Sequence, residues 1–206
     1  MITKQIALTL VTALVFAAVC APQGKPIALG SAMPAETVSM ISTDDKPMTL
    51  ANARGKTGTL VIFTCNHCPY VKAWQDRMTA IANDAVKSGV GVAFINANDA
   101  SVYPEDDHAH MKSLAKEKGY RFPYLIDGTS AVAIAFGASR TPEAFLFDAK
   151  GSLVYHGAVD DSVHAPAKVN HHYLKDAIAS LISGKKIALP ETKSVGCSIK
   201  FHGSER

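Results

Sequence analysis

Two cysteines separated by two residues form the clearest chemical pattern in this sequence of 206 residues. They belong to the motif Cys65-Asn66-His67-Cys68, in which one thiol can attack a disulfide and the other can resolve the mixed disulfide. The attacking species is the thiolate, and a position at a helix N-terminus can lower a cysteine pKa from about 8.5 to as low as about 3.5. The motif therefore predicts thiol–disulfide exchange, with Cys65 as the nucleophile and Cys68 as the resolving thiol.

The histidine between the two cysteines is a second candidate for a chemical role. A protonated imidazole at His67 would favour the thiolate of Cys65 and so stabilise the reduced form of the pair. The alternative is a loop histidine that faces solvent. We expect His67 to tune the pair.

Cys197 is left without an obvious partner, because Cys20 lies in an N-terminal segment that is expected to be removed or lipidated. An odd thiol in an oxidising compartment indicates a reactive or intermolecular role. The segment around Cys197 is long enough to fold back over the motif. We therefore hypothesise that Cys197 lies near Cys65 and Cys68 as a second resolving thiol; the alternative is a buried cysteine that packs under the tail.

Short apolar strands alternate with helical patterns around the motif. The run 59–64 is almost continuously apolar, as in a buried parallel strand, and it ends directly before Cys65. A pattern with apolar residues at helical spacing follows over 70–87. The other expected elements are a hairpin of 37–42 and 47–50, strands at 90–95, 124–126, 144–147 and 152–156, and helices at 104–118, 131–136 and 169–182.

The order of these elements, a hairpin followed by β, α, β, α, α, β, β, α, resembles the thioredoxin layout. We therefore expect an α/β thioredoxin fold: a mixed central sheet with helices on both faces, an N-terminal β-hairpin extension and a C-terminal tail. In that fold a cis-proline before the strand at 144–147 faces the C-x-x-C motif and exposes a backbone edge for a substrate peptide. Thr141-Pro142 stands at this point, so we expect a cis peptide bond and a role in substrate docking there.

Other functions of a C-x-x-C motif fit the sequence less well. A structural zinc site needs four ligands, and haem attachment needs a histidine directly after the second cysteine, where a proline stands. The peroxiredoxin pattern P-x-x-x-[ST]-x-x-C fails with Cys68 in the last position, because Val61 stands where the proline is required and Cys65 where the serine or threonine is required. The pattern also fails with Cys65 in the last position, because Gly58 stands in place of the proline and Ile62 in place of the serine or threonine. We expect no metal and no bound cofactor; a merely structural disulfide is an alternative.

Several sequence blocks together resemble one family, the peroxiredoxin-like branch of the thioredoxin-fold redoxins within the alkyl hydroperoxide reductase/thiol-specific antioxidant superfamily. The blocks are NHCPYVK at 66–72, NAND at 96–99, YPED at 103–106, FPYL at 122–125, TP at 141–142, FLFD at 145–148 and VGCSIK at 195–200. The resemblance covers about 37–201 and implies a thiol–disulfide redox protein in which Cys65 looks like the first thioredoxin cysteine. Arg140 departs from the family pattern, where a cysteine is frequent, and this would remove an extra redox partner.

The N-terminal segment predicts a secretory signal peptide, because Lys4 precedes an apolar run that ends in small residues. An uncleaved anchor helix and lipid attachment at Cys20 are the alternatives. No other stretch is long and apolar enough to span a bilayer, so we expect the mature chain in the periplasm or secreted. The expected parts are a signal peptide at 1–21, a linker at 22–36, one thioredoxin-like redoxin domain at 37–184 and a C-terminal tail at 185–206.

Charge and composition narrow the partners. The chain has 21 basic and 18 acidic residues, a net charge of +3, and this small excess gives no support for nucleic-acid binding. We predict an exported thiol–disulfide oxidoreductase, monomeric or dimeric, that acts on protein or small-molecule thiols and disulfides. The alternatives are a thiol-dependent peroxidase with antioxidant activity on peroxide and a periplasmic copper-binding module that uses Cys65, Cys68 and Cys197.

Overall fold

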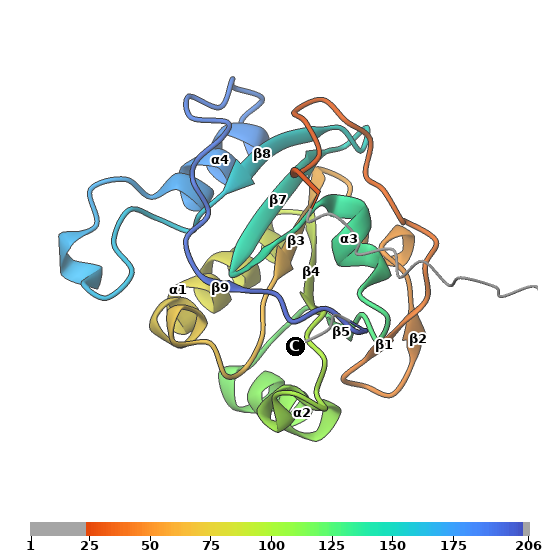
Figure 1. Cartoon of the computed structure of the whole chain (residues 1–206). Helices are drawn as coiled ribbons and strands as arrows, with labels where there is room; N and C mark the ends of the chain where they lie inside the picture. Colours follow the sequence, from red (N-terminus) through yellow and green to blue (C-terminus); the bar gives the residue numbers. More distant parts are fainter. Residues whose placement is uncertain (1–23, 204–206) are drawn as a thin grey trace, which may run out of the picture.

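A seven-stranded mixed sheet forms the centre of the chain (Figure 1). The computed structural model describes residues 24–203, so the predicted signal peptide and Cys20 lie outside the described residues. The strands of this sheet are β1 (Met40–Ser42), β2 (Pro47–Met48), β3 (Gly58–Phe63), β4 (Val90–Asn96), β5 (Tyr124–Ile126), β7 (Glu143–Asp148) and β8 (Leu153–Gly157). Their order across the sheet is β2-β1-β5-β4-β3-β7-β8.

The central strand β3 is buried on both faces, as its continuous apolar run predicts. It pairs in parallel with β4 on one side and antiparallel with β7 on the other. Leu60 and Ile62 lie in one hydrophobic core cluster, and Val61 and Phe63 lie in another on the opposite face. Two packed faces fix the strand firmly, and its carboxyl end leads directly to Cys65.

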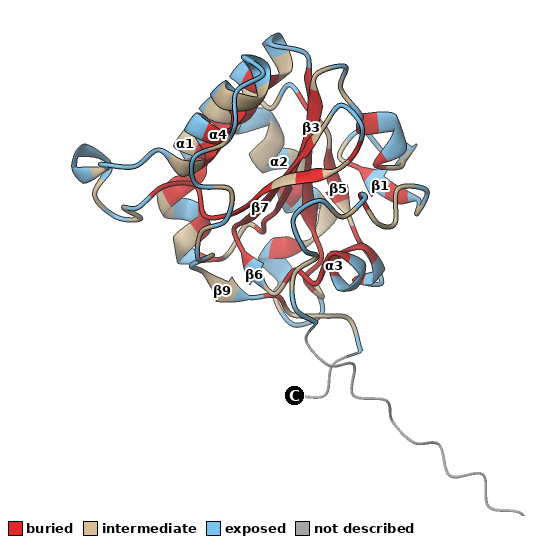
Figure 2. Ribbon diagram, turned by 90° about the horizontal axis from the view of Figure 1, so that it is seen from above, coloured by how far each residue is buried: buried red, intermediate tan, exposed pale blue. Residues whose placement is uncertain are grey.

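Helices cover both faces of the sheet, which confirms the predicted thioredoxin fold. Residues of α1, α2 and α4 pack in the cluster that contains Leu60, and residues of α3 pack in the cluster that contains Val61. Figure 1 shows α1 and α3 on opposite sides of the sheet, and Figure 2 shows the buried strands (red) between more exposed helix surfaces (blue). The helices are α1 (Pro69–Lys87), α2 (His108–Lys118), α3 (Ala131–Phe136) and α4 (Tyr173–Ile182), with 3₁₀ helices at Ala51–Ala53, Pro104–Asp106 and Pro166–Lys168.

Two predicted helices begin later than the sequence pattern indicates. The predicted helix 104–118 divides into a 3₁₀ turn and α2. The division comes at Asp107, whose side chain accepts a hydrogen bond from the backbone N–H of His110 (2.8 Å) and so caps α2. The predicted helix 169–182 is shortened at its N-terminal end to α4. As a consequence, Asp106 belongs to the turn before α2 and not to the helix.

Both segments that flank the predicted domain pack onto it. In the predicted linker, Met33 is buried and the backbone of Ala32 forms a β-bridge with Ser152. Part of the tail forms a second, two-stranded sheet, in which β9 (Cys197–Ser198) pairs antiparallel with β6 (Arg140–Thr141). Pairing over two residues leaves no periodic pattern in a sequence, because alternation needs a longer strand to be visible.

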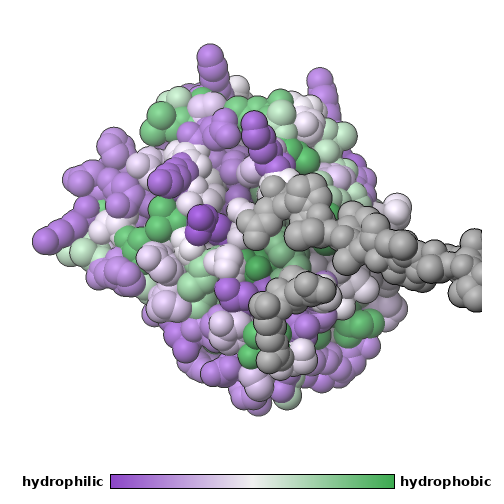
Figure 3. All heavy atoms as spheres, in the orientation of Figure 1, coloured by the Kyte–Doolittle hydropathy of each residue, from purple (hydrophilic) through white to green (hydrophobic). Residues whose placement is uncertain are grey.

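The outer surface gives little direct indication of function. None of the helices within residues 24–203 is long and apolar enough to cross a membrane. On the face drawn in Figure 3, hydrophobic residues (green) form separate groups among hydrophilic ones (purple). The chemically distinctive residues lie instead at the carboxyl end of β3.

Candidate active site

The C-x-x-C motif lies where β3 ends and α1 begins, as predicted. Cys65 follows the strand, and Cys68 is the N-cap residue of α1, whose first residue is Pro69. A proline at this position is well tolerated because the backbone donor it lacks would be unpaired in any case. Both thiols are buried, with Cys65 1 % and Cys68 0 % exposed. The helix N-terminus therefore acts on Cys68 more directly than on Cys65.

Thr141 contacts both sulfurs of the motif. Its hydroxyl group lies 3.3 Å from Sγ of Cys65, and its carbonyl oxygen lies 3.3 Å from Sγ of Cys68, to which the protonated thiol can donate. The peptide bond between Thr141 and Pro142 is cis, which confirms the prediction. The structure thus brings this dipeptide to the motif, while its role in substrate docking stays a prediction.

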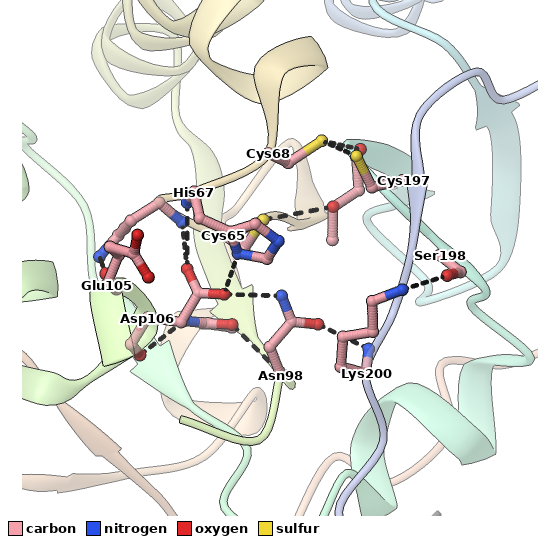
Figure 4. A network of polar contacts seen from close by, with 12 residues as sticks. Cys65, His67, Cys68, Asn98, Glu105, Asp106, Cys197, Ser198 and Lys200 are labelled. Atoms are coloured by element: carbon pink, nitrogen blue, oxygen red, sulfur yellow. Dashed lines mark hydrogen bonds and ion pairs between the residues drawn. The ribbon is translucent and has the colours of Figure 1, made fainter. Parts of the chain in front are cut away.

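The third thiol also lies at the motif. In the pairing of β6 with β9, Cys197 is the register partner of Thr141. Its Sγ lies 2.8 Å from Sγ of Cys68 (Figure 4). This distance exceeds the covalent S–S length of about 2.05 Å, and all three thiols are reduced. The hypothesis that Cys197 lies near the motif is therefore confirmed for Cys68.

The three thiols differ in acidity because they share hydrogen bonds. The interaction with the side chain of Cys65 is the main reason that the pKa of Cys68 falls. The thiol of Cys197 and the backbone N–H groups of Val71 and Cys197 act in the same direction, against the effect of burial. The same contact with Cys68 raises the pKa of Cys65, with burial and the negative charge of Asp106 adding to the increase. Burial first, and then the contact with Cys68, raise the pKa of Cys197 to about 11.

These acidities differ from those expected for a nucleophilic Cys65, and the role predicted for Cys65 stays a prediction. Cys68 occupies the N-cap of α1, and the backbone N–H of Val71 in the first turn helps to lower its pKa. Cys65 lies three residues before the N-cap and beside a buried carboxylate, which disfavours a second negative charge. These surroundings lower the pKa of Cys68 and raise that of Cys65.

A buried carboxylate that sequence reasoning did not assign to the site holds the motif loop. The side chain of Asp106 is fully buried, and its Oδ1 accepts hydrogen bonds from the backbone N–H groups of Asn66 (2.6 Å) and His67 (3.2 Å). Its Oδ2 accepts from Nδ2 of Asn98 (2.8 Å) (Figure 4). The available signal was the block 103–106, but its acidic residues read equally well as the first turn of a helix. Asp106 is therefore an anchor for the loop between the two cysteines.

His67 is held by the same carboxylate. Its Nδ1 lies 2.5 Å from Oδ2 of Asp106, and its ring stacks on that of Tyr103 with centroids 4.0 Å apart and planes inclined by 2°. Both contacts fix the imidazole beside the motif. The predicted influence of His67 on the acidity of the cysteines stays a prediction.

A metal site would have to use different ligands from those of the copper-binding alternative. Within the described part of the chain, the metal-ligating side chains that meet in a group of three are Cys65, His67 and Asp106, whose ligand atoms lie within 4.8 Å of one another. This donor set of one sulfur, one nitrogen and one oxygen does not have the all-sulfur character that suits Cu(I). The carboxylate already accepts hydrogen bonds from His67 and Asn98, so the geometry is that of a hydrogen-bonded network.

The comparison with protein families agrees with this site. The family model described as Redoxin matches residues 28–172. The chain belongs to the redoxin family. Membership confirms the resemblance of the sequence blocks to the redoxins and supports a thioredoxin-like redox function. A comparison with curated proteins found no match.

Solved structures include two that are similar to this redoxin over most of both chains. An uncharacterized conserved protein from Geobacillus kaustophilus is 37% identical, with a TM-score of 0.80, over 86% of this chain and 94% of its own. A hypothetical protein, SMc02350 from Sinorhizobium meliloti 1021, is 34% identical, with a TM-score of 0.80, over 86% of this chain and 97% of its own. Peroxidoxin BcpB from Mycobacterium tuberculosis is 15% identical, with a TM-score of 0.56, over 75% and 96%, and thus shares the fold alone.

Proposed function

We propose that this redoxin catalyses thiol–disulfide exchange, with Cys68 as the attacking thiolate and Cys65 as the resolving thiol. The observation that carries the proposal is the N-cap position of Cys68, where its thiolate is favoured and its sulfur meets another thiol. This assignment reverses the roles predicted from the motif. The spacing of the motif identifies the pair of thiols, whereas the fold decides which of them lies at the helix N-terminus.

The exchange conserves atoms and electrons in two steps. The Cys68 thiolate attacks one sulfur of an external disulfide, the substrate S–S bond breaks, and one substrate thiolate leaves. Cys65 then loses its proton and attacks the Cys68 sulfur, which forms the Cys65–Cys68 disulfide and releases the second substrate thiolate. The substrate gains two electrons and the protein loses two, and the reverse reaction oxidises a substrate by the same path.

The resolving thiol becomes more acidic when the reaction needs it. In the reduced site, the hydrogen bond to the Cys68 sulfur is the largest cause of the raised Cys65 pKa. Once Cys68 carries a mixed disulfide, its sulfur has no negative charge, so it no longer raises the pKa of Cys65. The Thr141 hydroxyl, 3.3 Å away, still favours the Cys65 thiolate. Formation of the mixed disulfide thus prepares Cys65 for its own attack.

Two reactions of the purified chain test this proposal against the peroxidase alternative. One is the reduction of oxidised glutathione by the reduced protein, and the other is its consumption of hydrogen peroxide. We expect disulfide exchange that is lost in the double variant Cys65→Ser, Cys68→Ser, and slower peroxide consumption. Peroxide consumption that outpaces exchange would contradict the proposal and support oxidation of a cysteine to a sulfenic acid.

The rate at which Cys68 attacks an external disulfide should depend only weakly on pH in the neutral range. The pKa of Cys68 is lowered to about 4, so its thiolate persists as pH falls and is lost only when pH approaches that value. Between about pH 5.5 and about pH 7.5 we expect the single-turnover rate with oxidised glutathione to change by less than about threefold. A thiol with an ordinary pKa of about 8.5 would give a roughly hundredfold change over the same range, and such a result would count against Cys68 as a stabilised thiolate.

Export of the chain is part of the same proposal. It rests on residues 1–21, where a single lysine precedes an apolar run that ends in small residues. A compartment outside the cytoplasm would let the three remaining cysteines cycle between thiol and disulfide forms. The N-terminal mass of the protein recovered from the producing cells tests this: a chain that still begins at Met1 and stays in the cytoplasm contradicts export.

A further inference from the structure

The chain covers its own substrate edge with its C-terminal tail. β6 holds the residues before Pro142 where a substrate peptide is expected to pair, and β9 of the same chain pairs with it antiparallel. The side chain of Arg140 donates to the carbonyl oxygen of Gly196 (3.0 Å). A side chain at position 196 would meet the carbonyl oxygen of Thr141 at 2.1 Å, so the close approach of the tail requires the glycine.

The tail is also fastened beyond β9. Ile199 is buried, and its backbone N–H donates to the carbonyl oxygen of Ser139 (3.0 Å). The backbone N–H of Lys200 donates to Oδ1 of Asn98 (2.8 Å), whose amide group also donates to Asp106 (Figure 4). The tail is thus tied to the network that anchors the motif loop.

We infer that Cys197 is an internal substrate of the dithiol site, which exchanges with Cys68 on one side and with external thiols or disulfides on the other. This inference rests on the proposed function. Cys197 lies opposite Thr141 on the strand that pairs with the expected docking edge, and its Sγ is 2.8 Å from Sγ of Cys68. Cys68 is fully buried and Cys197 only partly, so of the two thiols Cys197 is the more accessible to a partner.

The relay is a sequence of balanced thiol–disulfide exchanges. When the Cys65–Cys68 disulfide is present, the Cys197 thiol loses its proton and attacks Sγ of Cys68; the bond to Cys65 breaks and Cys65 leaves as a thiolate that takes up a proton. An external thiol then attacks Sγ of Cys197 and displaces Cys68, which is a good leaving group because its thiolate is stabilised. A second external thiol releases Cys197. Two external thiols thereby form one disulfide, and the protein disulfide becomes a dithiol.

The covered edge indicates the class of partner. An extended polypeptide would have to displace β9 before it could pair with β6, whereas a small thiol or disulfide needs only to reach the sulfur of Cys197. The tail therefore favours low-molecular-weight thiols and disulfides, or exposed single thiols, over long peptide segments. Partners that need the edge itself are expected to react faster when the tail is displaced.

Trapping in the Cys65→Ser variant tests the relay. The reduced variant is equilibrated with a mixture of reduced and oxidised glutathione, quenched with acid, alkylated and mapped by peptide mass. We expect a Cys68–Cys197 disulfide as the main oxidised form. Accumulation of glutathione on Cys68, with Cys197 left as a thiol, would overturn the inference.

Two further variants separate the thiol from the strand that carries it. Cys197→Ser removes the thiol and keeps the tail in place, and we expect its exchange with glutathione to be at least about tenfold slower. Ser198→Ala on the same strand is the matched control, and we expect its exchange rate to be unchanged. Gly196→Ala should displace β9 from β6, remove the Cys68–Cys197 disulfide and increase reduction of insulin disulfides. Equal exchange rates in Cys197→Ser and Ser198→Ala would overturn the relay.

The outcome also distinguishes this inference from the proposed function. If the chain forms a Cys65–Cys68 disulfide with glutathione but never a Cys68–Cys197 disulfide, the relay fails and the proposed exchange stands. If no disulfide forms at Cys65 or Cys68 in the unaltered chain, the proposed function itself fails.

Discussion

In a Cys197→Ser background, the substitution Cys68→Ser is expected to slow thiol–disulfide exchange by at least about a thousandfold, because a serine hydroxyl cannot replace the attacking thiolate. Cys65→Ser in the same background should behave differently. Cys68 can still attack oxidised glutathione, but no thiol remains to resolve the product, so one glutathione per chain stays on Cys68. The background is needed because Cys197, with its Sγ 2.8 Å from that of Cys68, would otherwise act as the resolving thiol. Peptide mass mapping and single-turnover rates give the readouts.

The reciprocal result would identify the assignment that the motif alone predicts. If Cys68→Ser accumulates glutathione on Cys65 while Cys65→Ser stays unmodified, Cys65 is the attacking thiol. The two thiols are equally buried, so access does not decide between these results. The deciding factor is the surroundings of each sulfur: the N-cap position of Cys68 and a buried carboxylate near Cys65.

The fold is predictable from the sequence where local pattern and tertiary structure agree. The continuous apolar run at 59–64 corresponds to β3, which has to be buried on both faces, and the elements expected at 124–126 and 131–136 coincide with β5 and α3. The helix predicted at 104–118 begins earlier than the observed α2, because acidic residues occur both in first helical turns and at N-caps. Only the three-dimensional position of Asp106, turned inward to the motif loop, separates the two uses.

The cysteines of the candidate site can be predicted from the sequence, but the groups that change their acidity cannot. The spacing of Cys65 and Cys68 and the dipeptide Thr141-Pro142 are local signals, and the structure brings them together. Cys197, 129 residues from Cys68, is expected near the motif only because the number of cysteines is odd, and Asp106 meets Asn66 from 40 residues away with no such signal. Such contacts depend on how elements pack, and a single sequence carries no periodicity that reports them.

The Asp106→Ala variant is expected to lower the free energy of unfolding by about 3 kcal/mol, which corresponds to a decrease in Tm of about 6 to 12 °C. The reason is that the fully buried carboxylate accepts hydrogen bonds from two backbone N–H groups of the motif loop and from Asn98. Its removal leaves these buried donors without partners, and each such donor costs about 1 kcal/mol or more. Urea denaturation of the reduced protein measures the change, with an unchanged m value as the sign of a purely stability effect.

Asp106→Asn separates the charge of this residue from its role as an anchor. The amide oxygen can still accept from the backbone of the loop, but the negative charge that raises the pKa of Cys65 is gone, so that pKa should fall. The pH dependence of alkylation at Cys65, located by peptide mass, gives the readout. Glu105→Gln is the matched control, because it removes the same charge, one residue away, from an exposed side chain. The hydrogen bond from Asn66 to the backbone carbonyl of residue 105 is kept in this variant. If both variants shift the Cys65 pKa equally, Asp106 acts through general charge and not through its buried position beside the thiol.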